Sequence, residues 1–446
     1  MLANVRCCRL WILAATLPLA VSRVWAVPAF PGAEGFGAAA TGGRRGEVYH
    51  VTRLDDDPRD PQVGSLRHAV AAGDRIIVFD VGGYIDLKDP LGVTASNITL
   101  AGQTAPGGGV GLRGRKFSVG GQNLVVRGMR FRYGRIGGNP RNDAVNINDR
   151  AENVLFDHCS VQFGQDENFS MIGRNITVQW CIIAWGLQPH SCGSLLTANN
   201  TTIHHTLWAH NHTRNPKARG QVLDWINNVV YDWDIPFIAG DTVNGQHAAN
   251  IRGCVFIAGP GKPTDKAVVK GRLNAKGVPT FSLYLDSTLL DGDANGELDG
   301  RDLGWAIVDG QVGRSDAPHP AAAVTVDDPM TAFRRIVEQV GAICPQRDQV
   351  DALLVRQLLD QQGGIIASQA ELGLPNEGFG DLAAGTPPPD TDRDGMPDDW
   401  ERKHGLDPND PADRNGDVTG DGYTNVEKYL NSLLPAPPPQ PPGEQR

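Results

Sequence analysis

The sequence predicts an all-β fold, a parallel β-helix with flanking terminal helices, followed by a small C-terminal calcium-loop module. The main observation is a repeat. Asparagine precedes short runs of β-forming residues at spacings of 22 to 30 residues, at positions 97, 123, 153, 175, 200, 228 and 250. No segment of helical periodicity lies between these runs, and a repeat built only from strands is typical of stacked coils. A β-sandwich would not explain asparagine recurring at one register.

Composition agrees with a turn-rich β protein. The 446 residues are 40% hydrophobic and 21% charged, with 54 glycines and 31 prolines. This balance is that of a globular chain with enough apolar side chains for a core. The formal net charge is −10, and no broad basic field exists. Nucleic acid is therefore excluded as an expected partner.

The first residues predict a signal peptide over 1–26. Arg6 and Arg9 precede an apolar run from Leu10 to Leu19, and small residues stand before a cleavage point after Ala26. We therefore expect a secreted protein, extracellular or periplasmic. No later segment is apolar enough for a membrane span. Five cysteines remain after cleavage, an odd and scattered set that does not indicate a disulfide scaffold.

Within the main domain, 27–385, the recurring asparagines are expected to stack into a hydrogen-bonded ladder at one bend of the coil. Cys159 and Cys181 each follow their asparagine by six residues, so they should stack inside the coil as well. Apolar residues at helical spacing predict helices over 330–340 and 350–361. We expect these helices to cap or flank one end of the solenoid, where open strand edges need protection.

A second unit is predicted over 386–434, behind a stiff linker at 386–389, with a disordered proline-rich tail at 435–446. Its first part fits a calcium loop. The matching residues are Asp390, Asp392, Asp394, Gly395, Met396, Asp398 and Glu401. Position 7 of such a loop, here Met396, contributes its backbone carbonyl. All the specified side-chain positions are filled, so the sequence predicts a calcium site.

A second loop of the same kind begins at Asp417, with Asp421 and Asn425 at ligand positions. Its twelfth position holds Lys428 where a bidentate glutamate is expected, so weaker calcium binding is predicted. The paired loops resemble dockerin and thrombospondin-type calcium repeats, which implies attachment to a cell surface or a protein partner. A third run at 291–302 has the same spacing, and a surface loop without calcium explains it equally well.

Two groups of charged residues in the main domain could act on a ligand. Arg214, Lys217 and Arg219 form a dense cationic strip that suits a polyanion. Asp143 stands upstream of Asp166 and Glu167, which makes a set of three acids. Neighbouring coils are about 4.8 Å apart, so stacked acids would repel unless a cation compensates. Carboxylate oxygens favour calcium.

Several motifs of the main domain match those of a known family. The segments AFPGAEGFG, GSLRHAV, ITLAGQTAPGGG, VVRGMRFRYG, FDHCS, HSCGSLL and HNHTRNP together closely resemble the secreted bacterial pectate lyases. The resemblance covers roughly 28–380 and implies a right-handed parallel β-helix. It also implies calcium-dependent cleavage of a pectate-like (1→4)-linked galacturonan by β-elimination to 4,5-unsaturated oligouronides. The resemblance implies that Arg214 is the base, that Arg219 binds a substrate carboxylate, and that Asp143 and Asp166 hold calcium. Lys217 and His190 are further candidates for substrate binding, and Glu167 is a further candidate calcium ligand.

The chain departs from the family pattern at three places. Arg141 and Ser170 stand where acids are common, and His190 lies near a position that some members fill with lysine. These departures keep two alternatives open, a pectin-binding β-helix without turnover and a β-helical galacturonan hydrolase. A hydrolase needs two opposed carboxylates. Asp166 and Glu167 are adjacent and are expected to point to opposite faces of a strand, which makes a poor pair. A monomer is expected.

Overall fold

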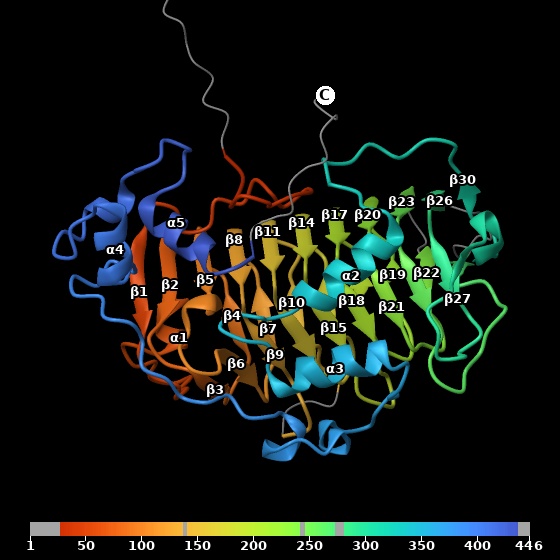
Figure 1. Cartoon of the computed structure of the whole chain (residues 1–446), viewed down its shortest axis with the longest axis horizontal. Coiled ribbons are helices and arrows are strands. Elements are labelled where there is room, and N and C mark those ends of the chain that lie inside the picture. Colours follow the sequence, from red (N-terminus) through yellow and green to blue (C-terminus); the bar gives the residue numbers. More distant parts are fainter. Residues whose placement is uncertain (1–26, 137–140, 241–245, 273–280, 436–446) are drawn as a thin grey trace, which may run out of the picture.

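The computed structural model describes residues 27–136, 141–240, 246–272 and 281–435. These residues form an elongated solenoid in which successive coils stack along one axis (Figure 1). Each regular coil gives one strand to each of three sheets, and the strands of neighbouring coils pair in parallel. The predicted parallel β-helix is thereby confirmed. The predicted signal peptide, and the predicted tail beyond Pro435, lie outside the described residues.

The three sheets are named here in the order in which a coil visits them. The first contains β1 (Glu47–Val51), β2 (Arg75–Phe79), β5 (Ile98–Ala101), β8 (Gln122–Arg127), β11 (Glu152–Asp157), β14 (Arg174–Gln179), β17 (Asn199–His204), β20 (Val222–Ile226), β23 (His247–Arg252), β26 (Phe281–Asp286) and β30 (Gly313–Arg314). The second contains β3 (Gly83–Asp86), β6 (Val110–Arg113), β9 (Arg130–Arg132), β12 (Ser160–Gln162), β15 (Ile182–Ala184), β18 (Leu207–Ala209), β21 (Val229–Tyr231), β24 (Val255–Ile257), β27 (Leu289–Asp291) and the antiparallel β28 (Arg301–Asp302). The third contains β4 (Leu91–Val93), β7 (Phe117–Val119), β10 (Val145–Ile147), β13 (Phe169–Met171), β16 (Leu195–Leu196), β19 (Lys217–Ala218), β22 (Phe237–Gly240), β25 (Val269–Arg272) and β29 (Val308–Asp309).

An asparagine ladder runs along the corner where coils enter the first sheet. The amide of Asn123 donates to Asn97 at 3.0 Å, and Asn153, Asn175 and Asn200 each donate to the asparagine one coil before at 3.2 Å. All five have positive φ, between 53° and 59°. Asparagine tolerates this left-handed conformation better than other side chains, which explains why it recurs there.

Asn228 and Asn250 do not continue this ladder, and the prediction was wrong for them. Asn250 lies inside β23 and donates to Asp224 at 2.9 Å. Asn228 belongs to a second ladder at the next corner, where its side chain accepts from the backbone of Thr206 at 3.0 Å. The predicted Cys159–Cys181 stack lies in this second ladder, with the Cys159 backbone N–H 3.4 Å from the Cys181 sulfur.

The helices are α1 (Leu66–Ala69), α2 (Pro329–Gln339), α3 (Gln349–Leu359), α4 (Asp398–His404) and α5 (Asn425–Ser432), with short 3-10 turns at Gly102–Thr104, Gly304–Ile307, Gln369–Leu372, Asn376–Gly378 and Asp413–Asn415. Both predicted long helices, α2 and α3, are present. They lie across the outer face of the second sheet rather than over an end of the solenoid (Figure 1). Ile336 and Leu354 pack there in one apolar cluster with Ile182, Leu207 and Val229. None of the described helices has the length and apolar character needed to cross a membrane.

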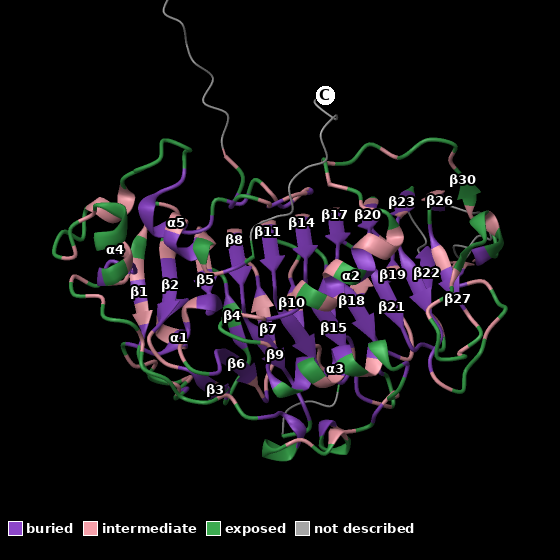
Figure 2. Cartoon of the chain, viewed as in Figure 1, coloured by how far each residue is buried: buried purple, intermediate pink, exposed green. Residues whose placement is uncertain are grey.

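The predicted C-terminal module lies against the first sheet, near the start of the solenoid (Figure 1). Met396, Val426 and Leu430 are buried in one cluster with Ile76 and Val78, which point outward from β2. The sequence suggested a unit separated from the solenoid by a proline-rich linker, whereas the apolar residues of this module pack against the first sheet. Figure 2 shows that buried residues fill the strands of the solenoid, whereas exposed residues lie mainly on the loops.

Candidate active site

The predicted site residues of the main domain gather along one edge of the third sheet. The loops that lead into it come before β10, β13, β16 and β19, and their described residues are 133–136, 141–144, 163–168, 185–194 and 210–216. Bridges pair Glu167 with Cys192 and Cys192 with Thr213. The β10–β13 register extends this row to Asp143. Stacking therefore brings residues from four coils to one place on the outer surface.

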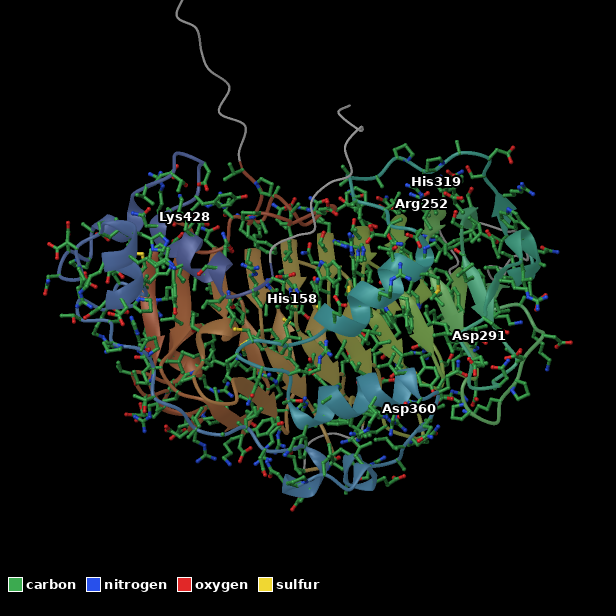
Figure 3. The ribbon with its side chains drawn as sticks, viewed as in Figure 1. His158, Arg252, Asp291, His319, Asp360 and Lys428 are labelled. Carbon is green, nitrogen blue, oxygen red and sulfur yellow. The ribbon has the colours of Figure 1, made fainter. Side chains whose placement is uncertain are left out.

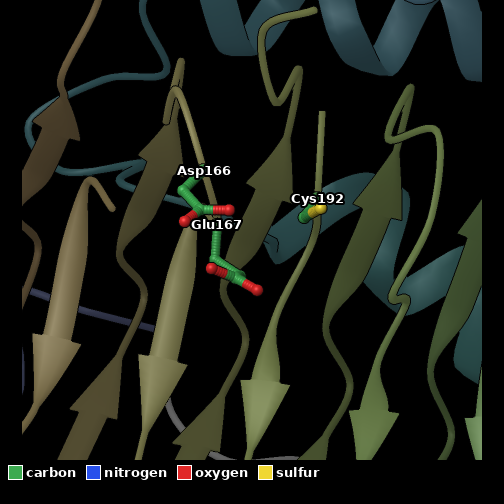
Figure 4. A group of neighbouring side chains, drawn as sticks. All are labelled: Asp166, Glu167 and Cys192. Carbon is green, nitrogen blue, oxygen red and sulfur yellow. The ribbon is translucent and has the colours of Figure 1, made fainter. Parts of the chain in front are cut away.

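Asp166 and Glu167 lie together here, which corrects the expectation that they point to opposite faces. One oxygen of each carboxylate lies within 4.8 Å of the other and of the Cys192 sulfur (Figure 4). The physical reason is that 163–168 is a loop rather than a strand, so strand alternation does not apply. Sequence reasoning had not placed Cys192 in the site; its bridge position one coil after Glu167 follows only from the register.

Arg214 reaches this group from the next coil. Its Nη1 donates to Glu167 Oε1, and its side chain is 31% exposed while that of Glu167 is 5% exposed. Its backbone has a φ of 60°, a left-handed conformation that costs energy for a long side chain. Such strain is retained where the surrounding structure demands it, often at functional sites. The backbone of Arg214 is fixed by its carbonyl, which accepts from Ser194 N at 2.7 Å.

The electrostatics of the acids follow from burial and crowding. Burial raises the pKa of Glu167 to about 7, with Asp143 and Asp166 adding to the shift and Arg214 opposing it. Burial also raises the pKa of Asp143, opposed by hydrogen bonds from the Glu167 backbone, Ser170 and Asn146. Ionisation of these acids is therefore unfavourable, and a bound cation would stabilise their negative charge.

His190 lies on the solvent side of the cluster. Its Nδ1 is 2.9 Å from Asp166 Oδ1, and nearly half of its side chain is exposed. His190 and Arg214 thus each contact one acid of the group. Ser170, at a position where the family often has an acid, bonds Asp143 instead of adding a charge.

Lys217 and Arg219 flank Ala218 on the coil that carries Arg214. Ala218 faces the core, so its two neighbours belong to the outer face of the third sheet. Lys217 pairs in register with Leu195 and Ile238. Arg219 has a buried Nε that finds no hydrogen-bond partner among the residues that the structure describes. The three predicted cations are therefore on one coil and one face of the solenoid.

The donor set fits a hard divalent cation. Asp143, Asp166 and Glu167 offer carboxylate oxygens from two neighbouring coils, which is calcium chemistry. Burial raises the pKa of Cys192 to about 12, so the thiol stays neutral and does not add a soft ligand. Asp166 and Glu167 would hold the ion, because their oxygens converge, and Asp143 lies beside them, where it accepts from the Glu167 backbone at 3.2 Å. Ser170 leaves the set one carboxylate short of the family pattern.

The predicted tail residues form a separate site about the first loop. Asp390, Asp392 and Asp394 offer oxygens within 4.8 Å of one another, and Asp394 forms a second such group with Glu401 and Asp413. Asp413 was missed because it lies beyond the twelve-residue loop. Asp398 instead accepts from the backbone of Thr391 at 2.8 Å.

In the second predicted loop, Asp417 and Asp421 both contact Lys428, and Asn425 accepts from the backbone of Val418 at 2.9 Å. The 291–302 run brings Asp291, Asp293 and Asp299 together beside a cavity of about 550 Å³. In Figure 3, Lys428 and Asp291 lie toward opposite ends of the solenoid. The described residues thus contain four groups of converging ligand atoms, two of which share Asp394, and only one group lies on the third sheet.

Comparison with known proteins gives full-length relatives. "Probable pectate lyase C" of Neosartorya fischeri is 42% identical over 429 residues, covering 93% of this chain and 95% of the relative. The protein of the same name from Emericella nidulans is 42% identical over 436 residues, covering 95% and 96%. The first match leaves fewer residues of this chain unmatched than 386–434 contains, so part of that segment has a counterpart there.

Among solved structures, one titled "Pectate lyase bound to hexasaccharide" has a TM-score of 0.51 and 14% identity, covering 72% of this chain and 99% of that one. At this identity the likeness concerns the fold. No protein-family model matches the chain.

Proposed function

The chain belongs to the pectate lyase family, and from that premise we propose that it is exported and cleaves a pectate-like galacturonan by calcium-assisted β-elimination. The observation that carries this proposal is Arg214, held beside Glu167 on the same face as Lys217 and Arg219. Full-length relatives at 42% identity support a pectate-cleaving lyase. The proposal adds the role of each residue, the calcium ion and the unsaturated products.

Substrate binding follows from charge. A galacturonan carries one carboxylate per sugar, and guanidinium groups match carboxylates in a bidentate manner. Lys217 and Arg219 lie two residues apart on β19 and just after it, with their side chains on the outer face. The polymer would run along the third sheet, with a uronate near the acids and His190 at the edge of the same site.

Elimination begins at the carbon α to the uronate carboxylate. Arg214 removes the C5 proton, the C–H electron pair becomes the C4=C5 bond, and the C4–O bond breaks. The departing sugar oxygen takes the electron pair and a proton from solvent. Bound calcium would supply a positive charge that stabilises the enediolate developing on the carboxylate. Arg219 would stabilise the same charge from the protein side.

The contact between Arg214 and Glu167 links the base to the cation. Burial lowers the pKa of Arg214, but the neighbouring acids, Glu167 and Asp166, help to outweigh burial, and the pKa is raised. A protonated guanidinium cannot accept a proton. Glu167, once neutralised by a cation, no longer favours the charged form of Arg214, and a cation beside Arg214 disfavours it further. Glu167 would thus hold Arg214 in place while the site is at rest.

The test is a paired assay. Purified protein is incubated with polygalacturonate or methylated pectin, with calcium or with a chelator. Ultraviolet absorbance from unsaturated ends, present with calcium and lost on chelation, is the expected result. New reducing ends without absorbance would instead indicate hydrolysis. Binding of the polymer with neither signal would indicate a module without turnover.

A further inference from the structure

The two tail loops share one backbone conformation, and the first loop illustrates it. Asp390 accepts from Gly395 N at 3.0 Å, and Asp394 accepts from Met396 N at 2.9 Å. Gly395 has a φ of 91°, which only glycine adopts without strain. Thus the side chains at positions 1 and 5 turn inward and are held by the backbone N–H groups at positions 6 and 7.

The second loop repeats these bonds at the same positions. Asp417 accepts from Gly422 N at 2.8 Å, and Asp421 accepts from Tyr423 N at 3.1 Å. Gly422 has a φ of 92°. The two loops therefore differ in what occupies their interior rather than in how the backbone runs.

The interior of the first loop holds carboxylates without partners. Glu401 is fully buried, and neither of its oxygens has a hydrogen-bond partner in the described residues. Asp394 is 1% exposed and also has an unpartnered oxygen, as does Asp413 from beyond the loop. Asp394, Glu401 and Asp413 offer ligand atoms within 4.8 Å of one another. Buried carboxylate oxygens left unpaired are costly, and a bound cation is the natural partner.

The interior of the second loop holds an ammonium group instead. Lys428 stands at position 12, where the first loop has Glu401, and its Nζ is 2.6 Å from Asp417 and 2.9 Å from Asp421. It also donates to the carbonyl of Tyr423. Two carboxylates and a backbone carbonyl are the ligands that a calcium loop offers its ion. The lysine hydrogen-bonds with groups of the kind that would bind the metal.

We propose that this module takes a single calcium ion, held in the first loop by Asp390, Asp392, Asp394, Glu401 and Asp413, and that the Lys428 ammonium replaces the ion in the second. The first loop thus takes a cation that can exchange with solvent, whereas the cation of the second loop is the ammonium group of Lys428. This inference is independent of the lyase activity, since the loops contribute no residue to the third sheet.

The position of the ion gives it a structural role. Met396 follows Asp394 by two residues and is buried against Ile76 and Val78 of β2. The second loop leads into α5, which is tied to the solenoid by Arg44–Glu427 at 2.7 Å. Calcium in the first loop would fix the turn that presents Met396, and so fasten the chain end to the solenoid.

The first test converts the second loop into a calcium site. In the full-length protein, Lys428→Glu supplies the missing position-12 acid. Native mass spectrometry at fixed free calcium should show one more ion per chain than the parent. Lys428→Gln is the matched control; it should gain no ion and should melt at a lower temperature with or without calcium. A folded Lys428→Glu variant, judged by circular dichroism, that gains no ion would overturn the proposal.

The second test converts the first loop into a lysine loop. Glu401→Lys should bind one ion fewer than the parent, and calcium should raise its melting temperature less. Asp413→Asn should weaken calcium binding at least tenfold, whereas Asp399→Asn, at an exposed acid of the same module, should not. The proposal fails if Glu401→Lys keeps the parent's ion count. It also fails if Asp417→Asn removes an ion, because the second loop would then hold calcium in the native protein.

Discussion

On the third sheet, Glu167 and Asp166 each lie against a side chain that can carry positive charge, whereas Asp394 and Glu401 in the first tail loop have oxygens with no partner in the described residues. Burial raises the pKa of Glu167 in the first group and of Asp394 and Glu401 in the second. On the third sheet both acids have a side chain that can carry positive charge beside them, whereas in the first tail loop Asp390 has one, His50 at 3.8 Å.

The difference teaches what each group is suited for. At the third sheet, Arg214 and His190 each contact an acid, so a cation there would compete with groups of the protein. In the first tail loop, His50 lies 3.8 Å from Asp390, but neither oxygen of Glu401 has a hydrogen-bond partner in the described residues, so an ion would meet less competition there. The first arrangement suits a site that changes partners during turnover, and the second suits a permanent structural ion.

The largest expected effect comes from replacing the Arg214 guanidinium on the third sheet. Arg214→Lys should lower kcat by about 10²–10⁴-fold, the usual contribution of a positioned base, because the ammonium is shorter and cannot occupy the same position. Initial rates of ultraviolet absorbance on polygalacturonate measure this. The melting temperature should stay close to that of the parent. Near-normal turnover would place the base elsewhere.

A crossed pair of variants separates the two groups. Asp166→Ala should raise the calcium concentration for half-maximal activity about tenfold, because affinity follows the number of charged ligands. It should leave the calcium-dependent rise in melting temperature intact. Asp394→Ala should instead reduce the calcium-dependent rise in melting temperature and leave the calcium concentration for half-maximal activity unchanged. Calcium titrations followed by activity and by thermal unfolding check both; identical behaviour of the two variants would mean that the groups are not independent.

Packing of the tail on the solenoid predicts a loss of stability when it is weakened. Met396 is fully buried in the cluster with Ile76 and Val78. Met396→Ala should therefore lower the free energy of unfolding by about 2–5 kcal/mol. Denaturant titration of the full-length protein measures the loss. Substitution of exposed Val418 by alanine is the matched control, with almost no change expected.

The smallest expected effect is a pH dependence that calcium removes. In calcium-free buffer, burial raises the pKa of Asp394 to about 8 and that of Glu401 to about 7. Between their ordinary values near 4 and these values, the folded state holds more protons than the unfolded chain, so stability falls as pH rises. Melting temperatures at pH 5, 6.5 and 8 should decrease by a few degrees. With saturating calcium, or in Glu401→Gln, the slope should flatten.

Sequence reasoning found the solenoid because its strongest signal, the asparagine period, reflects a left-handed corner that few other residues tolerate. It misplaced Asn228 because two corners of the coil both accept asparagine, and spacing alone does not say which corner is meant. It also placed the long helices at an end. Their apolar stripes specify burial, but not which surface buries them.

For the candidate site, the sequence named the residues but not their pairings. Asp166 and Glu167 were assigned to opposite faces because a loop of 163–168 looks like a strand when only the pattern is known. Asp413 lies outside any twelve-residue loop, so only the fold brings it to Asp394 and Glu401. The position of Lys428 was noted as a missing ligand, whereas its ammonium lies between the two aspartates.

The asparagine ladder has a consequence for how such a chain can diversify. The corner from the first to the second sheet is equally uniform, with the short connections 158–159, 180–181 and 205–206. In the coils that build the candidate site, the loops into the third sheet differ more in length, from 163–168 to the longer 185–194. The strands on either side of these loops stay in register. Length can therefore vary in the loops that carry Asp166, His190 and Arg214 without a change in the strand pairing that holds them.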